Sequence, residues 1–169
     1  MKRFVWLLAV SLFVLIAFWV QAQPKEVTEA VAITYCVNMK ALPLDEGRVR
    51  MSYEAFGLAV TSTGQGIFHM ATSHNLGGMT MEKGVFKDEQ GAGLWTLLSG
   101  DKVFYTYTFA GASKPVGVGE AKGMVTLTGG TGKCTGIQGS YPATRYTVRT
   151  PVEGVVHSYI QATIKYTLP

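Results

Sequence analysis

The chain has 169 residues and a formal net charge of +4, with 20 glycines and only two cysteines. This length suits one domain with a sizeable core and is short for two ordinary domains. The charged residues are scattered without a basic stripe, which argues against a nucleic-acid partner.

The N-terminus has the pattern of a secretory signal peptide. Met1 to Arg3 form a short cationic start, residues 4–20 carry no charge, and Val20 to Ala22 offer small residues at the spacing of a cleavage site. We therefore expect cleavage after Ala22, a single domain at 23–169 and a periplasmic or secreted protein. The alternative is an uncleaved anchor, but the apolar run is shorter than the ~20 residues usual for a membrane span. We expect no stable membrane anchor after signal removal.

Glycine clusters divide the remaining chain into short segments rich in Val, Ile, Thr, Tyr and Phe. No segment after residue 23 keeps a sustained helical period, which argues against long helices. We predict strands at residues 27–38, 48–61, 66–73, 77–87, 93–99, 102–110, 120–128, 141–149 and 154–167. Eight or nine strands at regular spacing are typical of a sandwich or barrel, and we predict an all-β fold, a small antiparallel β-barrel of about eight strands.

Two of these strands show a clear period of two. The odd positions from Val103 to Phe109 are apolar, and in the last strand Val156, Ile160 and the following even positions share one face. Such alternation predicts antiparallel strands with one buried face. The segment around Gly100 and Asp101 predicts a tight hairpin turn between the predicted strands at 93–99 and 102–110.

The second predicted strand changes its apolar face along its length. Val49 and Met51 occupy odd positions, whereas Phe56 and Leu58 occupy even ones. One extra residue near Ala55 would reconcile the two halves, so we infer a β-bulge there. The alternative is a strand that is apolar on both faces and covered outside by a loop or a partner chain.

The two cysteines, Cys36 and Cys134, lie far apart in the sequence. In the oxidising compartment that export implies, such a pair can close a disulfide across a fold. We therefore predict a Cys36–Cys134 disulfide as one interpretation and two separate buried thiols as the other.

The stretch from Leu127 to Gly139 reads LTGGTGKCTGIQG and resembles the Gly-Gly-Thr-Gly turn of the allene oxide cyclase and dirigent-like β-barrel family. Exported bacterial proteins with this barrel-like domain share the resemblance. In those proteins the turn joins two strands, and the order is similar here. The resemblance implies a barrel and, as one activity, a cofactor-free isomerase or cyclase. Cys134 stands where those families often carry an aromatic residue, and no catalytic residue is carried over.

Few side chains form a recognisable catalytic or metal-binding pattern. His69 and His74 are five residues apart, so a strand would point them to opposite faces, and no metal site is predicted. His69 alone suits a general acid or base, although a hydrogen-bonded structural role is the favoured interpretation. Glu54 would suit proton transfer inside the barrel, but we favour the surface for it. We place Asp88–Glu89 in a solvated turn.

Methionine and aromatic side chains recur along the predicted strands, and flexible Met side chains adapt to varied ligands. We expect a small lipophilic molecule in the barrel interior, with no cofactor. The side chains expected to contact it are Tyr53, His69, Trp95, Tyr105 and Tyr107. Simple core packing is the alternative explanation of these side chains.

Three functions are compatible with this sequence, and whether the protein is an enzyme stays open. The leading hypothesis is a ligand-binding barrel; the others are the isomerase or cyclase and a non-catalytic envelope interaction module. A buried carboxylate or histidine in an enclosed pocket would favour the enzyme, and an apolar cavity the binder. A filled barrel with an exposed apolar patch would favour the interaction module. A homo-oligomer is also left open.

Overall fold

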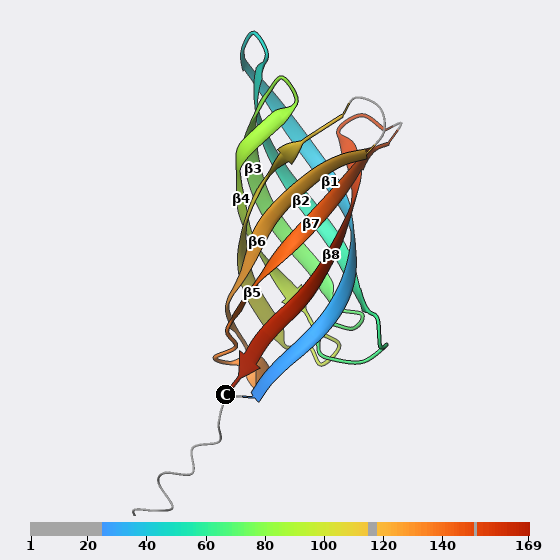
Figure 1. Cartoon of the computed structure of the whole chain (residues 1–169), viewed down its shortest axis with the longest axis vertical. Coiled ribbons are helices and arrows are strands. Elements are labelled where there is room, and N and C mark those ends of the chain that lie inside the picture. Colours follow the sequence, from blue (N-terminus) through green and yellow to red (C-terminus); the bar gives the residue numbers. More distant parts are fainter. Residues whose placement is uncertain (1–24, 115–117, 151) are drawn as a thin grey trace, which may run out of the picture.

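In the computed structural model, which describes residues 25–114, 118–150 and 152–169, eight strands close into an antiparallel barrel (Figure 1). Each strand pairs with the next in the chain, and β1 pairs with β8 to close the sheet. The strands are β1 (Lys25–Asp45), β2 (Arg48–Thr61), β3 (Thr72–Glu82), β4 (Val85–Thr96), β5 (Lys102–Ala112), β6 (Val118–Gly130), β7 (Gly139–Arg149) and β8 (Val155–Leu168). The predicted fold class is confirmed, while the predicted signal peptide at 1–22 lies outside the described residues.

The alternation predicted for two strands is confirmed. Along β5 the odd residues from Val103 to Phe109 are buried and the even ones between them face outward. Along β8, Ile160, Ile164 and Tyr166 are buried on the even side. The hairpin between β4 and β5 also forms as expected, with Gly100 at a positive φ of 85°.

The predicted strand at 66–73 is wrong, because most of that segment belongs to a loop between β2 and β3. Phe68 and Ala71 are both fully buried, a spacing of three that an extended strand cannot bury on one face. Met70 between them adopts a positive φ of 58°. The loop folds under the barrel and fills its lower end. The predicted strands at 77–87 and 93–99 are replaced by β3 and β4, which turn at Lys83–Gly84.

The β-bulge inferred near Ala55 is also wrong. The register of β2 against both β1 and β3 runs through this position without a shift. Ala55 is buried, while Phe56, Leu58 and Val60 point outward and stay 36–47% exposed. The strand is therefore apolar on both faces, as in the alternative interpretation, but no described loop covers its outward side chains, which stay partly exposed.

A register shift occurs instead on β4. Phe86 pairs with Gly111 and Glu89 with Phe109, so three steps on β4 oppose two steps on β5. The extra residue lies at Lys87–Asp88, and such a bulge changes which positions face inward. Phe86 and Glu89 are both buried, although one is even and the other odd. This shift turns Glu89 into the barrel.

The two ends of the barrel differ. The lower end is closed by the loop at 62–71 and the turn at 131–138, which contains the short 3₁₀ helix η1 (Gly132–Cys134). The core there is aromatic and aliphatic, with Phe68 against Trp95 and Tyr166 edge-on at ring-centroid distances of 6.0 and 5.6 Å. The upper end, which we call the mouth, lies at the β1–β2, β3–β4, β5–β6 and β7–β8 connections (Figure 1).

Glu29 fastens the lower loop to the barrel wall. Its buried carboxylate accepts the backbone N–H groups of Ile67 and Phe68 at 3.0 and 3.2 Å and the Tyr166 hydroxyl at 2.5 Å. A buried carboxylate needs such donors because its desolvation would otherwise be costly. Glu29 is therefore a structural group of the closed end.

The two cysteines do not form the predicted disulfide. Cys36 occupies an outward position on β1, opposite Phe56 of β2 and His157 of β8, and is exposed. Cys134 is buried in η1, and both cysteines are free thiols. A bridge between Cys36 and Cys134 would have to cross the barrel wall, which the short reach of a disulfide forbids. Of the other interpretation, two buried thiols, only the Cys134 half holds.

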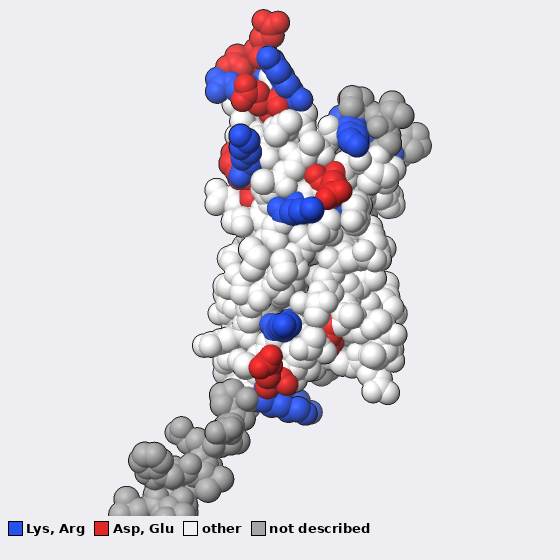
Figure 2. Space-filling view, in the orientation of Figure 1, with Lys and Arg blue, Asp and Glu red and all other residues white. Residues whose placement is uncertain are grey.

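Charged side chains are unevenly distributed on the face of the barrel that Figure 2 shows. On the face shown in Figure 2 they gather toward the mouth and, in smaller number, near the lower end, with few on the belt between. Among the described residues, no helix has the length and apolar character needed to cross a membrane.

Candidate ligand-binding site

The upper half of the barrel encloses a cavity of about 570 Å³ that opens at the mouth. This volume lies within the range of small-molecule sites in proteins, which are mostly apolar with a few placed polar groups. Its apolar lining includes Met39, Met51, Met79, Met81, Phe86 and Phe109. Its polar lining below the mouth includes Tyr35, Tyr53, Asn75, Tyr105, Tyr107 and Arg145.

The tyrosines fit inside the barrel because strand alternation points them inward and the neighbouring strands carry glycines there. Tyr105 and Tyr107 are inward positions of β5, and their partners on β4 are Gly93 and Gly91, with Gly77 next to Gly91 on β3. A Cβ at Gly91 would collide with the Tyr107 hydroxyl, and one at Gly93 would come within 2.7 Å of the Tyr105 ring. The glycines therefore create the space in which the phenol groups lie.

A buried ion pair forms one wall of the site. Arg145 on β7 binds Glu89 on β4 through both terminal nitrogens, with Nη1 2.5 Å from Oε1 and Nη2 2.6 Å from Oε2. The Glu89 side chain is fully buried and that of Arg145 is 14% exposed. The guanidinium carbon also lies 5.0 Å from the Phe109 ring centroid and 5.8 Å from that of Phe86. The pair is charge-balanced and held by bidentate and cation–π contacts.

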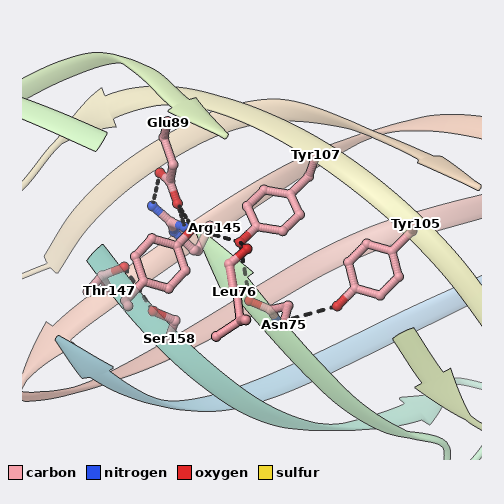
Figure 3. A network of polar contacts seen from close by, with 9 residues as sticks. Asn75, Leu76, Glu89, Tyr105, Tyr107, Arg145, Thr147 and Ser158 are labelled. Atoms are coloured by element: carbon pink, nitrogen blue, oxygen red, sulfur yellow. Dashed lines mark hydrogen bonds and ion pairs between the residues drawn. The ribbon is translucent and has the colours of Figure 1, made fainter. Parts of the chain in front are cut away.

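A chain of hydroxyl and amide groups extends from this pair across the barrel (Figure 3). The Tyr53 hydroxyl donates to Glu89 Oε1 at 2.5 Å and lies 2.9 Å from the Tyr107 hydroxyl. Tyr107 also lies within 3.2 Å of Asn75 Oδ1, and Asn75 Nδ2 donates to the Tyr105 hydroxyl at 3.2 Å. One connected network therefore joins β2, β3, β4, β5 and β7 around the cavity.

The tyrosines of this network are protonated hydrogen-bonding groups. Burial raises the pKa of Tyr53, and the nearby Glu89 charge raises it further. Burial likewise raises the pKa of Tyr105 and Tyr107 above the ordinary value. Burial alone would lower the pKa of Arg145, but the hydrogen bonds and charge of Glu89 offset this and raise it. The network thus contains neutral phenols and one permanent cation.

Three of the five predicted ligand contacts line the cavity, and two do not. Tyr53, Tyr105 and Tyr107 are in its wall. Trp95 is 1% exposed and packs below Tyr105, with their ring centroids 5.7 Å apart, so it belongs to the floor. His69 lies in the lower loop, where its Nδ1 is 3.2 Å from the Thr61 hydroxyl, at the end opposite to the mouth.

The other candidate groups are on the outer surface. Glu54 faces outward as favoured, and its Oε1 lies 2.7 Å from His74 Nε2. The His74 ring stacks on Phe56 with 4.7 Å between centroids. The exposed side chains of Phe56, Leu58 and Val60, with the His74 ring stacked on Phe56, form a patch over β2 and β3 that we call the outer apolar patch.

The sequence interpretation missed both members of the ion pair. Glu89 had been placed in a solvated turn because the bulge at Lys87–Asp88 hides its parity. Arg145 was detectable, since Tyr141, Ala143, Arg145 and Thr147 continue one face of β7. A charged residue in the middle of this inward face, between Ala143 and Thr147, is the signal that could have identified it.

The described part of the chain contains no group of three or more His, Cys, Asp or Glu side chains placed to hold a metal ion. The sequence matches no family model, and no curated protein matches it. The turn at 129–139 that carries the resemblance to allene oxide cyclase and dirigent-like barrels lies at the closed end, away from the cavity. Membership of that family stays a prediction.

Proposed function

We propose that this protein is exported and binds a small lipophilic molecule inside the barrel. The observation that carries the proposal is the cavity of about 570 Å³, open at the mouth, whose lining includes four Met, two Phe and four Tyr side chains. Apolar lining supplies affinity through removal of ligand surface from water, and a few polar groups orient the guest.

Calorimetric titration with fatty acids, terpenoids and aromatic acids tests the proposal. We expect saturable one-to-one binding of at least one class. Replacing Ala121, a buried residue in the cavity wall, by Phe should weaken that binding by about tenfold or more because the new ring occupies the ligand's space. Ala92→Phe on the outer face of β4 is the matched control. Equal binding by wild type and Ala121→Phe would place the ligand elsewhere.

Export has its own test. The proposal expects the secreted or periplasmic protein to begin at Gln23, which intact-mass measurement would detect. Recovery of the full-length chain in the membrane fraction would contradict it.

A cofactor-free isomerase or cyclase is the second candidate, and the buried Glu89 with its Tyr53 contact favours it. Carboxyl and phenol groups in a water-poor pocket are suited to proton transfer. Chromatographic analysis of an unsaturated epoxide incubated with the protein would show a new isomer in the enzyme case. If the epoxide binds but the chirality and composition of its products are the same as without the protein, binding is the only function supported.

The outer apolar patch is the observation that favours a third role, contact with another envelope component. Phe56 is 47% exposed and Val60 43% exposed, and apolar groups gathered on one face mark interaction sites. Because the barrel is not filled, we rank this role below ligand binding.

A further inference from the structure

The charges around the cavity are arranged in two layers. Near the mouth, two exposed cations and two exposed carboxylates line the entrance: Lys114, Arg149, Glu120 and Glu153. Deeper in the cavity, the only charged side chain in the described lining is Arg145. Its charge is balanced by Glu89, which binds it but does not itself line the cavity. The deep part of the cavity therefore has no net charge to match an ionic ligand.

The charge of Arg145 is already compensated, although Glu89 uses only two of its five N–H groups. Its two terminal nitrogens already hold both oxygens of Glu89, which is the fork geometry that otherwise grips a ligand carboxylate. Its Nε is buried and has no hydrogen-bond partner among the described residues. A second carboxylate beside this pair would add an uncompensated buried charge, which is unfavourable.

The remaining groups match a ligand that both donates and accepts. The Tyr53 hydroxyl donates to Glu89, and the Tyr107 hydroxyl donates toward Asn75 Oδ1 and the Leu76 carbonyl oxygen, so both phenol oxygens retain lone pairs that can accept a hydrogen bond. The Asn75 amide uses one N–H on Tyr105 and retains a second donor. A hydroxyl can donate to a phenol oxygen and accept from an amide. A carboxylate only accepts, so its oxygens would face tyrosine lone pairs.

We propose, on the basis of the proposed function, that the ligand is uncharged and carries a hydroxyl group that reaches Asn75, Tyr53 and Tyr107. The Glu89–Arg145 pair is then a specificity device. It supplies strong local hydrogen bonding without presenting a free cation, and it discriminates against acids of the same shape.

A matched pair of ligands tests this directly. Farnesol and farnesoic acid share one chain and differ in their terminal group, and decanol with decanoic acid forms a second pair. At neutral pH, where the acids are ionised, calorimetry on the wild-type protein should show each alcohol binding at least about tenfold more tightly than its acid. Equal or tighter binding of the acids would overturn the neutral-ligand inference and leave the binding function standing. Absence of binding by all four would reject the neutral-ligand inference, and the binding function would be rejected only if the wider set of fatty acids, terpenoids and aromatic acids also failed to bind.

Two variants locate the cause of the discrimination. Glu89→Gln removes the compensating carboxylate, so Arg145 becomes a free cation and the acid-to-alcohol affinity ratio should rise by about tenfold or more. In the double variant Glu89→Gln, Arg145→Met no cation remains, and the ratio should not rise. Thermal unfolding verifies that each variant is folded, and if the single variant fails to fold, the wild-type pairs and the double variant decide. A rise in the double variant as well would contradict the assignment of specificity to Arg145.

Discussion

At the residue scale, Gly91 is the position where the site depends most directly on a missing side chain. The Tyr107 hydroxyl lies where its Cβ would be, and the Leu76 carbonyl oxygen is close to the same point. Gly91→Ala should therefore displace Tyr107 and destabilise the fold by about 1–3 kcal/mol, the usual cost of an overpacked core. Urea unfolding measures the change. Ala92→Ser, at the next and outward position, is the control and should change little; equal losses in the two variants would contradict the steric argument.

Arg145 makes a second residue-scale prediction. Arg145→Met leaves the fully buried Glu89 carboxylate without its cation, and breaking one side of a buried pair costs about 3–5 kcal/mol. Adding Glu89→Met should recover most of the loss, because two apolar groups of similar volume leave no orphaned charge. Denaturant unfolding of both variants provides the measurement. If the double variant is no more stable to denaturant than the single one, the loss comes from the missing contacts of the ion pair and not from an uncompensated Glu89 charge.

At the element scale, the Gly129–Gly132 turn shows two different reasons for glycine. Gly132 has a φ of 54°, which favours glycine, and a Cβ there would collide with the Asp101 carboxylate. Gly130 does not have a positive φ in the left-handed region; a Cβ there would come within 2.6–2.7 Å of the Cys134 backbone oxygen and Lys102 oxygen. Gly132 is therefore needed for its positive φ, whereas Gly130 is needed for close packing.

Both glycines should resist substitution by valine. We expect Gly130→Val and Gly132→Val each to lower the melting temperature, since a β-branched residue is strained at positive φ and the packed backbone at Gly130 cannot yield. Differential scanning calorimetry measures this. Gly132→Asn separates the causes at that position, because asparagine tolerates the left-handed region better than valine and should be less damaging if backbone strain dominates. An unchanged melting temperature in both valine variants would remove the structural role assigned to the turn.

At the scale of the whole molecule, local alternation was enough to predict the barrel. Strands such as β5 and β8 repeat every two residues because neighbouring side chains must face opposite sides of a sheet. The loop at 62–71 was misread because its buried Phe68 and Ala71 have strand-like composition without strand geometry. The Glu89–Arg145 contact joins β4 and β7, which are not neighbours in the sheet, so it depends on closure of the barrel. The face of β7 gives a local signal for Arg145, but no local pattern identifies Glu89 as its partner, so the pairing could not be predicted from the sequence.

The tyrosines also predict how the whole barrel responds to alkali. Burial is the first cause that raises the pKa of six of them, Tyr35, Tyr53, Tyr105, Tyr107, Tyr141 and Tyr166. In the unfolded chain each would ionise near pH ~10. The unfolded state then releases protons that the folded state keeps, so stability is fully present below about pH 10 and falls as the pH rises above it.

The slope of that loss is about 1.4 kcal/mol per pH unit for each tyrosine that stays protonated in the folded state. We expect tyrosinate absorbance of these residues to appear together with the loss of far-ultraviolet circular dichroism, as one cooperative step. Tyr141→Phe is the matched control, because Tyr141 is 2% exposed and its removal should reduce the slope by one tyrosine's share. Gradual ionisation of all tyrosines near pH ~10 in a protein that keeps its native spectrum would show that the interior is open to hydroxide and water.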